Sequence, residues 1–288
     1  MPKSTARFIS CRDCLICFPM AVRSSQRPVR RSQPQPARFG PRKRRFRWLR
    51  RLMVLATVVF VLFLGVRAYV MQVYAPGLES EAGTIPATVG LQLGEHGASY
   101  TSLADVSPTM RHAIVAIEDR RFYTHHGIDP IGLARAMWIN MTAQKMDQGG
   151  STLEEQLAKR AIVGNDRSIH GKLRTLALAW AIDRDFPKWK ILELYLNDAY
   201  YGQGAYGIEQ AAQIYFATNA SSLTVAQAAF LAAMPQAPSI YGAHPRSAAV
   251  LYRWKAVLAG MQSQGYITAA QERAAASTSL TFALPNPG

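Results

Sequence analysis

Beyond residue 17 the chain of 288 residues contains no cysteine, because its three cysteines are Cys11, Cys14 and Cys17. The rest of the chain cannot form a disulfide bond within itself, and it is compatible with an oxidising or a reducing compartment. The C-x-x-C-x-x-C spacing hints at a metal or cluster site, but it lacks a fourth ligand and lies among arginines and serines. We interpret this segment as an unstructured tail, or as an overextended start of the reading frame.

Acidic residues are almost missing from the first quarter of the chain. Residues 1–75 contain 16 of the 33 lysines and arginines but only one acidic residue, Asp13, whereas residues 76–288 carry 17 residues of each sign. The net charge of +15 therefore belongs to the N-terminal segment, and the remainder is neutral. This distribution argues against a nucleic acid as the partner of the folded region.

Charge is absent from one long apolar stretch, residues 52–66. Alone it is short for a span of ~20 residues, but Trp48 and Leu49 extend it on one side and residues 68–70 on the other, with Arg67 snorkelling to the interface. About fifty residues precede it, which favours an uncleaved anchor over the alternative, a cleaved signal peptide. Seven lysines and arginines flank its N-terminal side, and the 43 residues after Arg67 contain none. We expect a single-pass protein of the inner (cytoplasmic) membrane, with a cytoplasmic N-terminus and a periplasmic or extracytoplasmic domain.

Composition divides the chain into five parts. We expect a disordered basic cytoplasmic tail over 1–47, the transmembrane anchor over 48–74, a linker rich in proline and glycine over 75–100, a folded domain over 101–275 and a C-terminal tail over 276–288. Within the folded part the apolar residues recur at helical spacing, and neither a convincing strand ladder nor a glycine-rich phosphate loop is present. The fold class is therefore mostly α.

A helix beginning at Ser107 and Pro108 ends close to a candidate catalytic carboxylate. Its apolar residues recur at helical spacing up to Ile117, so Glu118 lies at the edge of the buried face, near the C-terminal end of the helix. The negative end of the helix and partial burial both oppose a charged carboxylate, so we expect a raised pKa for Glu118, which suits a general base. The alternative is an ordinary exposed glutamate in the charged run E-D-R-R.

A second candidate segment begins at the glycine pair 149–150. A doubled capping box follows, Ser151 with Glu154 or Thr152 with Glu155, and the predicted helix presents Gln156 and Lys159 on one face. Basic residues are frequent from there on: Lys159, Arg160, Arg167, Lys172 and Arg174. In a neutral domain such clustering suits a polyanion such as pyrophosphate, and the alternative is a solvated helix face.

Four motifs follow one another between residues 107 and 267. Residues 118–127 read E-D-R-R-F-Y-T-H-H-G, and residues 149–159 read G-G-S-T-L-E-E-Q-L-A-K. Residues 191–197 with 200–216 form the next motif, and P-Q-A-P-S-I-Y at 235–241 follows it. In this order they resemble the motifs of the peptidoglycan glycosyltransferases, which occur alone or joined to class A penicillin-binding proteins.

The resemblance implies a lysozyme-like, two-lobed helical domain preceded by a single transmembrane helix. It also implies an inverting transfer of a growing glycan from undecaprenyl pyrophosphate onto the 4-hydroxyl of lipid II, with Glu118 as the general base. The positions that match substrate-binding residues of the family are Asp119, Phe122, His125, Ser151, Gln156, Lys159, Arg167, Lys172 and Arg174. The apolar residues 131–139, on periodicity either a core helix or a surface helix in lipid headgroups, fit the family's membrane-embedded part.

The resemblance also implies partners and leaves the cofactor open. The expected partners are lipid II, the growing glycan strand, the membrane and other proteins of cell-wall synthesis, with no nucleic acid. No cofactor follows with certainty, although a divalent cation, Mg²⁺ or Mn²⁺, is compatible with the family. No S-x-x-K nucleophile with a K-T-G partner occurs, so no transpeptidase domain is expected in this sequence.

The sequence departs from the family at several positions. The third motif, R-K-x-x-E, falls on residues 171–175, where Lys172 is kept, the arginine is Gly171 and the second catalytic glutamate is Thr175. Glu155 stands in place of the first glutamine of the second motif, and Y-F-G-K has become Y-F-A-T at 215–218. The loss of a carboxylate at Thr175 motivates an alternative, a catalytically weakened lipid II-binding scaffold. A glycan hydrolase of the same shape is a third hypothesis.

Overall fold

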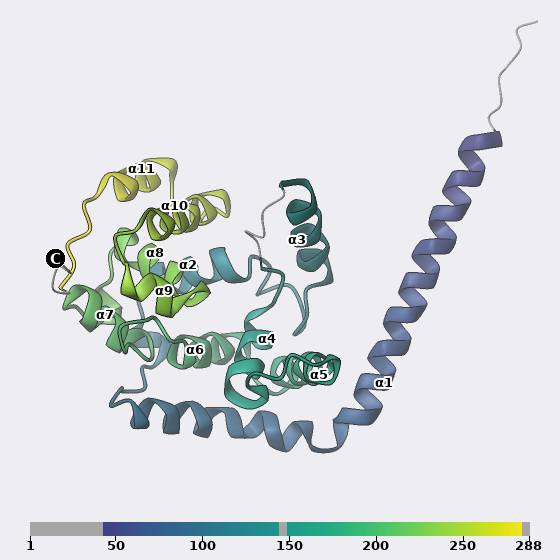
Figure 1. The fold of residues 1–288 in the computed structure, drawn as a ribbon, viewed down its shortest axis with the longest axis horizontal. Helices are drawn as coiled ribbons and strands as arrows, with labels where there is room; N and C mark the ends of the chain where they lie inside the picture. The colour runs from purple at the N-terminus through teal and green to yellow at the C-terminus, as the bar shows by residue number, and fades with distance from the viewer. Residues whose placement is uncertain (1–42, 144–148, 284–288) are drawn as a thin grey trace, which may run out of the picture. The chain divides into compact units, whose positions relative to one another are not determined.

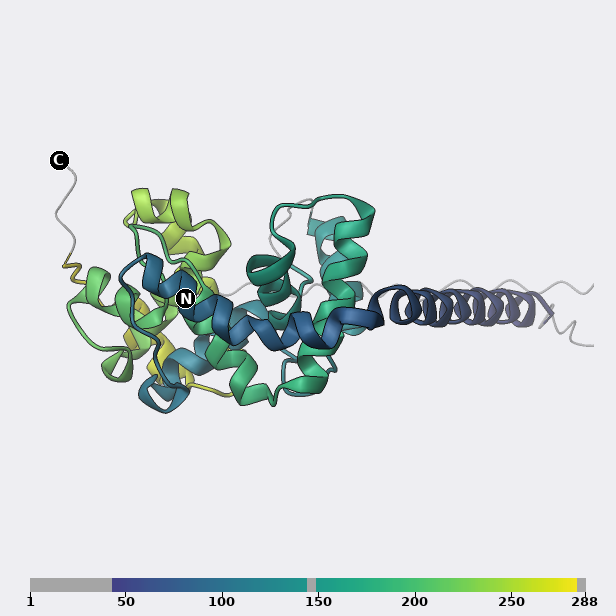
Figure 2. The ribbon, with the colours of Figure 1, turned by 90° about the horizontal axis from the view of Figure 1, so that it is seen from below.

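The computed structural model describes residues 43–143 and 149–283. The cysteines and most of the predicted tail lie outside these residues. The described part is helical, with isolated bridges in place of strands, so the mostly α prediction is confirmed (Figures 1 and 2). In chain order the elements are α1 (Lys43–Glu95), η1 (Leu103–Asp105), α2 (Pro108–Glu118), α3 (Pro130–Ala143), α4 (Leu153–Ala158), η2 (Lys159–Val163), α5 (Ile169–Asp185), α6 (Lys188–Asp198), α7 (Ile208–Phe216), η3 (Ala220–Ser222), α8 (Val225–Ala233), η4 (Met234–Gln236), α9 (Pro238–Ala243), α10 (Ala248–Ser263) and α11 (Ala269–Ser277).

The chain divides into two compact units, residues 1–56 and 57–288. Within α1, Arg47–Tyr69 is long and apolar enough to cross a membrane, with a mean hydropathy of 2.2, and none of it is buried inside the protein. An exposed apolar helix of 23 residues matches the thickness of a bilayer core. This helix coincides with the transmembrane anchor predicted over 48–74.

The C-terminal part of α1 corrects the prediction of a linker over 75–100. Residues 78–95 are helical, and five apolar side chains three or four residues apart are buried in the core: Leu78, Ala82, Ile85, Val89 and Leu93. Two carboxylates of this segment also pair with α5, Glu79 with Arg184 and Glu81 with Arg174. The glycines and prolines suggested irregular structure, but burial of one helical face outweighs their low helix propensity.

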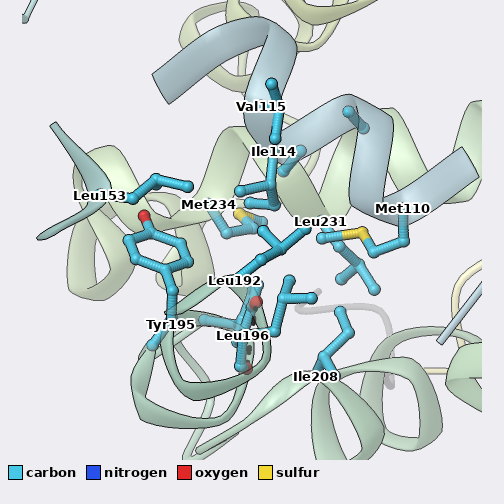
Figure 3. Packing of buried hydrophobic residues seen from close by; sticks show 14 of the residues in the cluster. Met110, Ile114, Val115, Leu153, Leu192, Tyr195, Leu196, Ile208, Leu231 and Met234 are labelled. Carbon is cyan, nitrogen blue, oxygen red and sulfur yellow. Dashed lines mark hydrogen bonds between the residues drawn. The ribbon is translucent and has the colours of Figure 1, made fainter. Parts of the chain in front are cut away.

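The core joins helices from distant parts of the second unit. Helices α2, α8 and α10 pack against one another, and α4 packs against α5 and α6. Figure 3 shows side chains from α2, α4, α6, α7 and α8 meeting in one cluster, among them Ile114, Leu153, Tyr195 and Leu231. Because α2, α4 and α6 share this cluster, the C-terminal end of α2 is held close to the second motif.

The predicted C-terminal tail over 276–288 is also partly wrong. The ring of Phe282 stacks on Phe216 at 5.6 Å between centroids and lies 4.9 Å from Phe230. The backbone N–H of Ala283 donates to the carbonyl oxygen of Tyr215 at 2.8 Å. Residues up to 283 therefore belong to the domain, while residues 284–288 lie outside the described part.

Ala217 ends α7 in a left-handed conformation, with φ 50° and ψ 42°. A Cβ in this region costs about 1 kcal/mol, and the family's Y-F-G-K motif has glycine here. We expect Ala217→Gly to raise the free energy of unfolding by roughly 0.5–1 kcal/mol, measured by thermal or chemical unfolding. Ala274→Gly, at an exposed site inside α11, is the matched control and should lower it by a similar amount. A loss of stability in both variants would contradict the prediction.

Candidate active site

Glu118 is the last residue of α2, and donors hold both of its carboxylate oxygens. Its Oε1 accepts a hydrogen bond from Nη2 of Arg253 at 3.0 Å, and its Oε2 accepts one from Nε2 of Gln156 at 2.9 Å. The Glu118 side chain is only 12% exposed, so the alternative of an ordinary exposed glutamate is wrong. The guanidinium of Arg253 forms an ion pair with this carboxylate.

A pocket of about 220 Å³ opens beside this carboxylate. Besides Glu118, its lining includes Arg120, Arg135, Gln236, Tyr241, Tyr252 and Arg253. Three arginines against one carboxylate leave the lining positively charged, which suits an anionic ligand.

Apart from Glu118, these pocket residues were not predicted as site residues from the sequence. Arg135 was visible as the one charge inside the apolar run 131–139, and Gln236 and Tyr241 belong to the P-Q-A-P-S-I-Y stretch. Arg253 lies on α10, 135 residues from Glu118, and no motif in the sequence analysis pointed to it. Only the packing of α10 against α2 brings the two side chains together.

Three residues of the first motif lie in the interior rather than at the pocket. The carboxylate of Asp119 accepts from the backbone N–H of Leu153 at 3.1 Å and lies 2.8 Å from Nε2 of His125, and all of these groups are buried. Phe122 is fully buried beside them. The side chains of Asp119, Phe122 and His125 have almost no free surface, and their predicted contact with substrate stays a prediction. Their bonds instead tie the end of α2 to the start of α4.

The Asp119–His125 pair lies beside a buried Glu154, and the three offer ligand atoms within 4.8 Å of one another. Burial acts to lower the pKa of His125, but the hydrogen bond and charge of Asp119 outweigh it and raise the pKa. The ammonium of Lys188 lies 2.7 Å from Oε1 of Glu154. Oε2 of Glu154 and Nδ1 of His125 are buried without a hydrogen-bond partner among the described residues, but a neighbouring ammonium and an imidazole do not suit Mg²⁺ or Mn²⁺, which prefer oxygen ligands. The divalent cation stays a prediction.

The second motif forms a capped helix that reaches Glu118. Thr152 is the N-cap of α4, where its Oγ1 accepts from the N–H of Glu155 at 3.2 Å and donates to the carbonyl of Gly127 at 2.7 Å. Of the two capping alternatives, the structure thus has the one at Thr152, and Ser151 is exposed. Gln156 lies one turn further along α4 and contacts Glu118, so residues of the first and second motifs meet at one place.

Glu155 is a carboxyl group at a position where the family has an amide. Burial raises its pKa to about 7, against an ordinary value of 4.5. Between these two values the folded state keeps a proton that the unfolded chain has released. Stability therefore falls as the pH rises through this window and levels off above it.

We expect Glu155→Gln to remove this pH dependence, because an amide does not titrate. The variant should gain about 1–2 kcal/mol of unfolding free energy near pH 8, a figure reduced from the full linkage value for partial exposure, and almost nothing near pH 4.5. Chemical unfolding at both pH values measures the difference. An equal gain at both would contradict the assignment to the Glu155 carboxyl.

The predicted basic cluster is divided between different surroundings. Lys159, Arg167 and Lys172 are exposed, on η2, the following loop and α5, which are neighbouring elements. Arg174 instead places one nitrogen 3.1 and 3.0 Å from the two carboxylate oxygens of Glu81. A carboxylate of α1 thus pairs with its guanidinium, and the predicted substrate role of Arg174 stays a prediction. The substrate roles of Ser151, Gln156, Lys159, Arg167 and Lys172 stay predictions.

The altered third motif is part of the local packing. A Cβ at Gly171 would lie 2.6 Å from the Cγ and the carbonyl oxygen of Asp166, so the arginine of the family does not fit there. The hydroxyl of Thr175 donates to the carbonyl oxygen of Gly171 at 2.8 Å, within the same helix. The loss of the second carboxylate is thus accompanied by a loop that packs closely on the start of α5.

Comparisons with known proteins agree with the motifs. The pattern of the transglycosylase family matches residues 87–262. Penicillin-binding protein 1A of Aquifex aeolicus is 38% identical over 247 residues, covering 80% of this chain and 33% of that protein. Penicillin-binding protein 1F of Bacillus subtilis is 39% identical over 168 residues, covering 58% and 24%. Among solved structures, penicillin-binding protein 1A from Haemophilus influenzae shares 21% identity at a TM-score of 0.38, covering 64% and 18%.

The chain spans about a third or less of the length of these relatives. The family match nevertheless covers more than half of the chain, and it begins inside the helical segment that had been predicted as a linker. The match, together with the motifs that meet around Glu118, establishes that this chain belongs to the transglycosylase family.

Proposed function

We propose that this chain is an inverting peptidoglycan glycosyltransferase, which polymerises lipid II into glycan strands and releases undecaprenyl pyrophosphate for cell-wall biosynthesis. The observation that carries the proposal is the carboxylate of Glu118, held by Gln156 and Arg253 at the edge of a cationic pocket. A charged carboxylate can accept a proton from a sugar hydroxyl, and the arginines suit a phosphate-bearing substrate.

The proposed step transfers one proton and one glycan. Glu118 takes the proton of the 4-hydroxyl of lipid II, and the hydroxyl oxygen attacks the anomeric carbon of the growing strand from the face opposite the pyrophosphate. The bond between that carbon and the pyrophosphate breaks, and its electrons leave with the diphosphate lipid. Arg120 and Arg135 in the pocket and the exposed Lys159 would stabilise the negative charge that develops there.

Two apolar surfaces support work at a membrane. Arg47–Tyr69 of α1 would anchor the chain, with the basic N-terminus in the cytoplasm and the domain on the opposite side. Helix α3 exposes Ile131, Leu133, Met137 and Trp138, so the alternative of a core helix is wrong. An exposed apolar helix near the pocket that contains Arg135 would suit the entry of a lipid-linked substrate.

The test is polymerisation of fluorescent lipid II by the purified full-length chain in detergent micelles or vesicles. Glycan strands resolved on a gel are the expected result, and arms with chelator, Mg²⁺ or Mn²⁺ determine whether a cation is required. Lipid II binding without strands would overturn the proposal in favour of the scaffold. Release of soluble fragments from wall sacculi, without polymerisation, would overturn it in favour of the hydrolase. Added cell-wall synthesis proteins in a further arm test the expected partners.

A further inference from the structure

A hydrogen-bonded chain runs from Glu118 into the interior. Nε2 of Gln156 donates to Glu118 at 2.9 Å, while the amide Oε1 of Gln156 accepts from the hydroxyl of Tyr195 at 3.1 Å. Nη1 of Arg160 also points at this amide oxygen, at 3.5 Å. The Nε of Arg160 donates to the carboxylate of Asp198, which is almost fully buried.

Arg160 is held from several sides. Its guanidinium lies over the ring of Tyr195, 4.6 Å from the centroid, in addition to its bond with Asp198. Burial acts to lower the pKa of Arg160, but Asp198 and Tyr195 outweigh it and raise the pKa, so the residue stays charged. The π-turn η2, closed by the N–H of Gly164 on the carbonyl of Lys159 at 2.8 Å, begins just before Arg160. Such turns are frequent at functional sites.

The direction of these bonds determines which end of the Gln156 amide faces Glu118. An amide can rotate by half a turn and present either its NH₂ group or its oxygen. Only the NH₂ group attracts a carboxylate, whereas the oxygen repels it. A tyrosine hydroxyl could donate or accept, but a guanidinium can only donate, so it accepts no bond from the NH₂ group. Arg160 therefore selects the orientation in which the amide oxygen points inward.

We propose that Arg160, fixed by Asp198 and Tyr195, is a positioning residue that holds the Gln156 amide with its NH₂ group toward Glu118. The proposal deepens the function proposed above and rests on Glu118 as the base. In this orientation the NH₂ group of Gln156 donates a charge-assisted hydrogen bond to Oε2 of Glu118. The bond stabilises the carboxylate form and leaves Oε1 of Glu118 on the side of the pocket. Arg160 was predicted as a member of the basic set for pyrophosphate, and its ion pair with the buried Asp198 argues for this different role.

Other charged groups face Glu118 from the helices around it. Arg253 comes from α10 and Arg135 from α3, while Asp119 and Arg120 follow Glu118 in the chain. Tyr195 faces Glu118 from α6. Burial, and to a smaller extent the charge of Glu118, raises the pKa of the Tyr195 hydroxyl, so the hydroxyl keeps its proton and can donate it. Variants at Arg160 leave all of these groups in place, and the comparison with the Gln156→Leu background separates the effect of the amide from the direct effect of the Arg160 charge.

The experiment is a direct titration of Glu118 in the full-length protein labelled with ¹³C at the glutamate carboxyl. The Glu118 signal is identified as the one missing in Glu118→Gln. We expect the titration midpoint to rise by roughly 1 pH unit in Gln156→Leu, the loss of one hydrogen bond to a charged group. Arg160→Met should shift it in the same direction, and Gln156→Leu/Arg160→Met should match Gln156→Leu alone, because Arg160 acts through Gln156.

Tyr195→Phe removes one hydroxyl and keeps the ring, so it covers the case in which Arg160→Met does not fold, and it should also raise the midpoint. Arg184→Met, at an exposed arginine on α5 paired with Asp185, is the matched control and should leave the midpoint unchanged. An unchanged midpoint in Arg160→Met and Tyr195→Phe would overturn the proposal, as would additive shifts in the double variant. Polymerisation assays of the same samples keep the two proposals distinguishable. A wild-type chain that forms no strands would overturn the proposed function, but the titration of Glu118 would still test the positioning role of Arg160.

Discussion

Glu118→Gln is expected to reduce the rate of lipid II polymerisation by at least about 100-fold, the lower end of what a general base contributes. The amide has the size of the carboxylate and can keep one of the two bonds, to Gln156 or to Arg253, through its oxygen, but it cannot take up a proton at neutral pH. The effect should appear in kcat, because the lost interaction belongs to the transition state, while lipid II binding should remain. The strand-forming assay and a separate binding measurement with labelled lipid II together resolve these two quantities.

Glu95→Gln is the matched control, because Glu95 is exposed at the end of α1. This variant should polymerise lipid II at the wild-type rate. The thermal midpoint of Glu118→Gln has to be measured beside it, since the side chain of Arg253 is only 13% exposed and loses its charged partner. A folded Glu118→Gln protein that retains a third or more of the wild-type rate would rule out Glu118 as the base. Such a threefold loss corresponds to only about 0.7 kcal/mol of transition-state stabilisation.

Ile85→Asp is expected to unfold the domain or to lower its unfolding free energy by roughly 4 kcal/mol or more. Ile85 is 0% exposed and lies in α1, within the segment that the sequence indicated to be a linker. The substitution removes a large apolar side chain from the core and buries a carboxylate among Val89, Leu93 and their neighbours in the cluster. Circular dichroism melting and limited proteolysis in detergent micelles measure the loss.

Leu91→Asp makes the same chemical change on the opposite side of this helix, where Leu91 is 71% exposed. Its unfolding free energy should stay within about 0.5 kcal/mol of the wild type. A true linker would tolerate both substitutions equally. Equal melting temperatures for the two variants would therefore mean that residues 78–95 contribute nothing to the core.

The predicted part of the site depended on motifs whose residues are close in the chain. Glu118 and Gln156 were identified from the first and second motifs, and the structure brings their side chains to 2.9 Å. Asp119 and His125 were identified from the same motif, but a motif does not say which residues face a ligand. Their carboxylate and ring bond to each other and to the start of α4, so burial gives them a structural role.

Helix propensity predicted the wrong conformation where glycine and proline are frequent. Gly83, Pro86 and Gly90 lie in α1 between buried apolar residues, and the pattern of Leu78, Ala82, Ile85, Val89 and Leu93 was present in the sequence. Between residues 83 and 90 glycine and proline outnumber the strong helix formers, yet the burial of one face decided the conformation. The same pattern, weighted above the glycines, would have indicated a helix.

The sequence by itself determined the helical class, the apolar segment able to span a membrane, the family motifs and the candidate base, because each depends on residue type and spacing along a local stretch. Only the tertiary structure decided which residues surround that base. Arg253 of α10 contacts the base itself, whereas Arg160 of η2, paired with Asp198 of α6, contacts its partner Gln156. Arg174 instead pairs with Glu81 of α1. Such partners are set by how helices distant in the chain pack together, and the local spacing of residues contains no information about that packing.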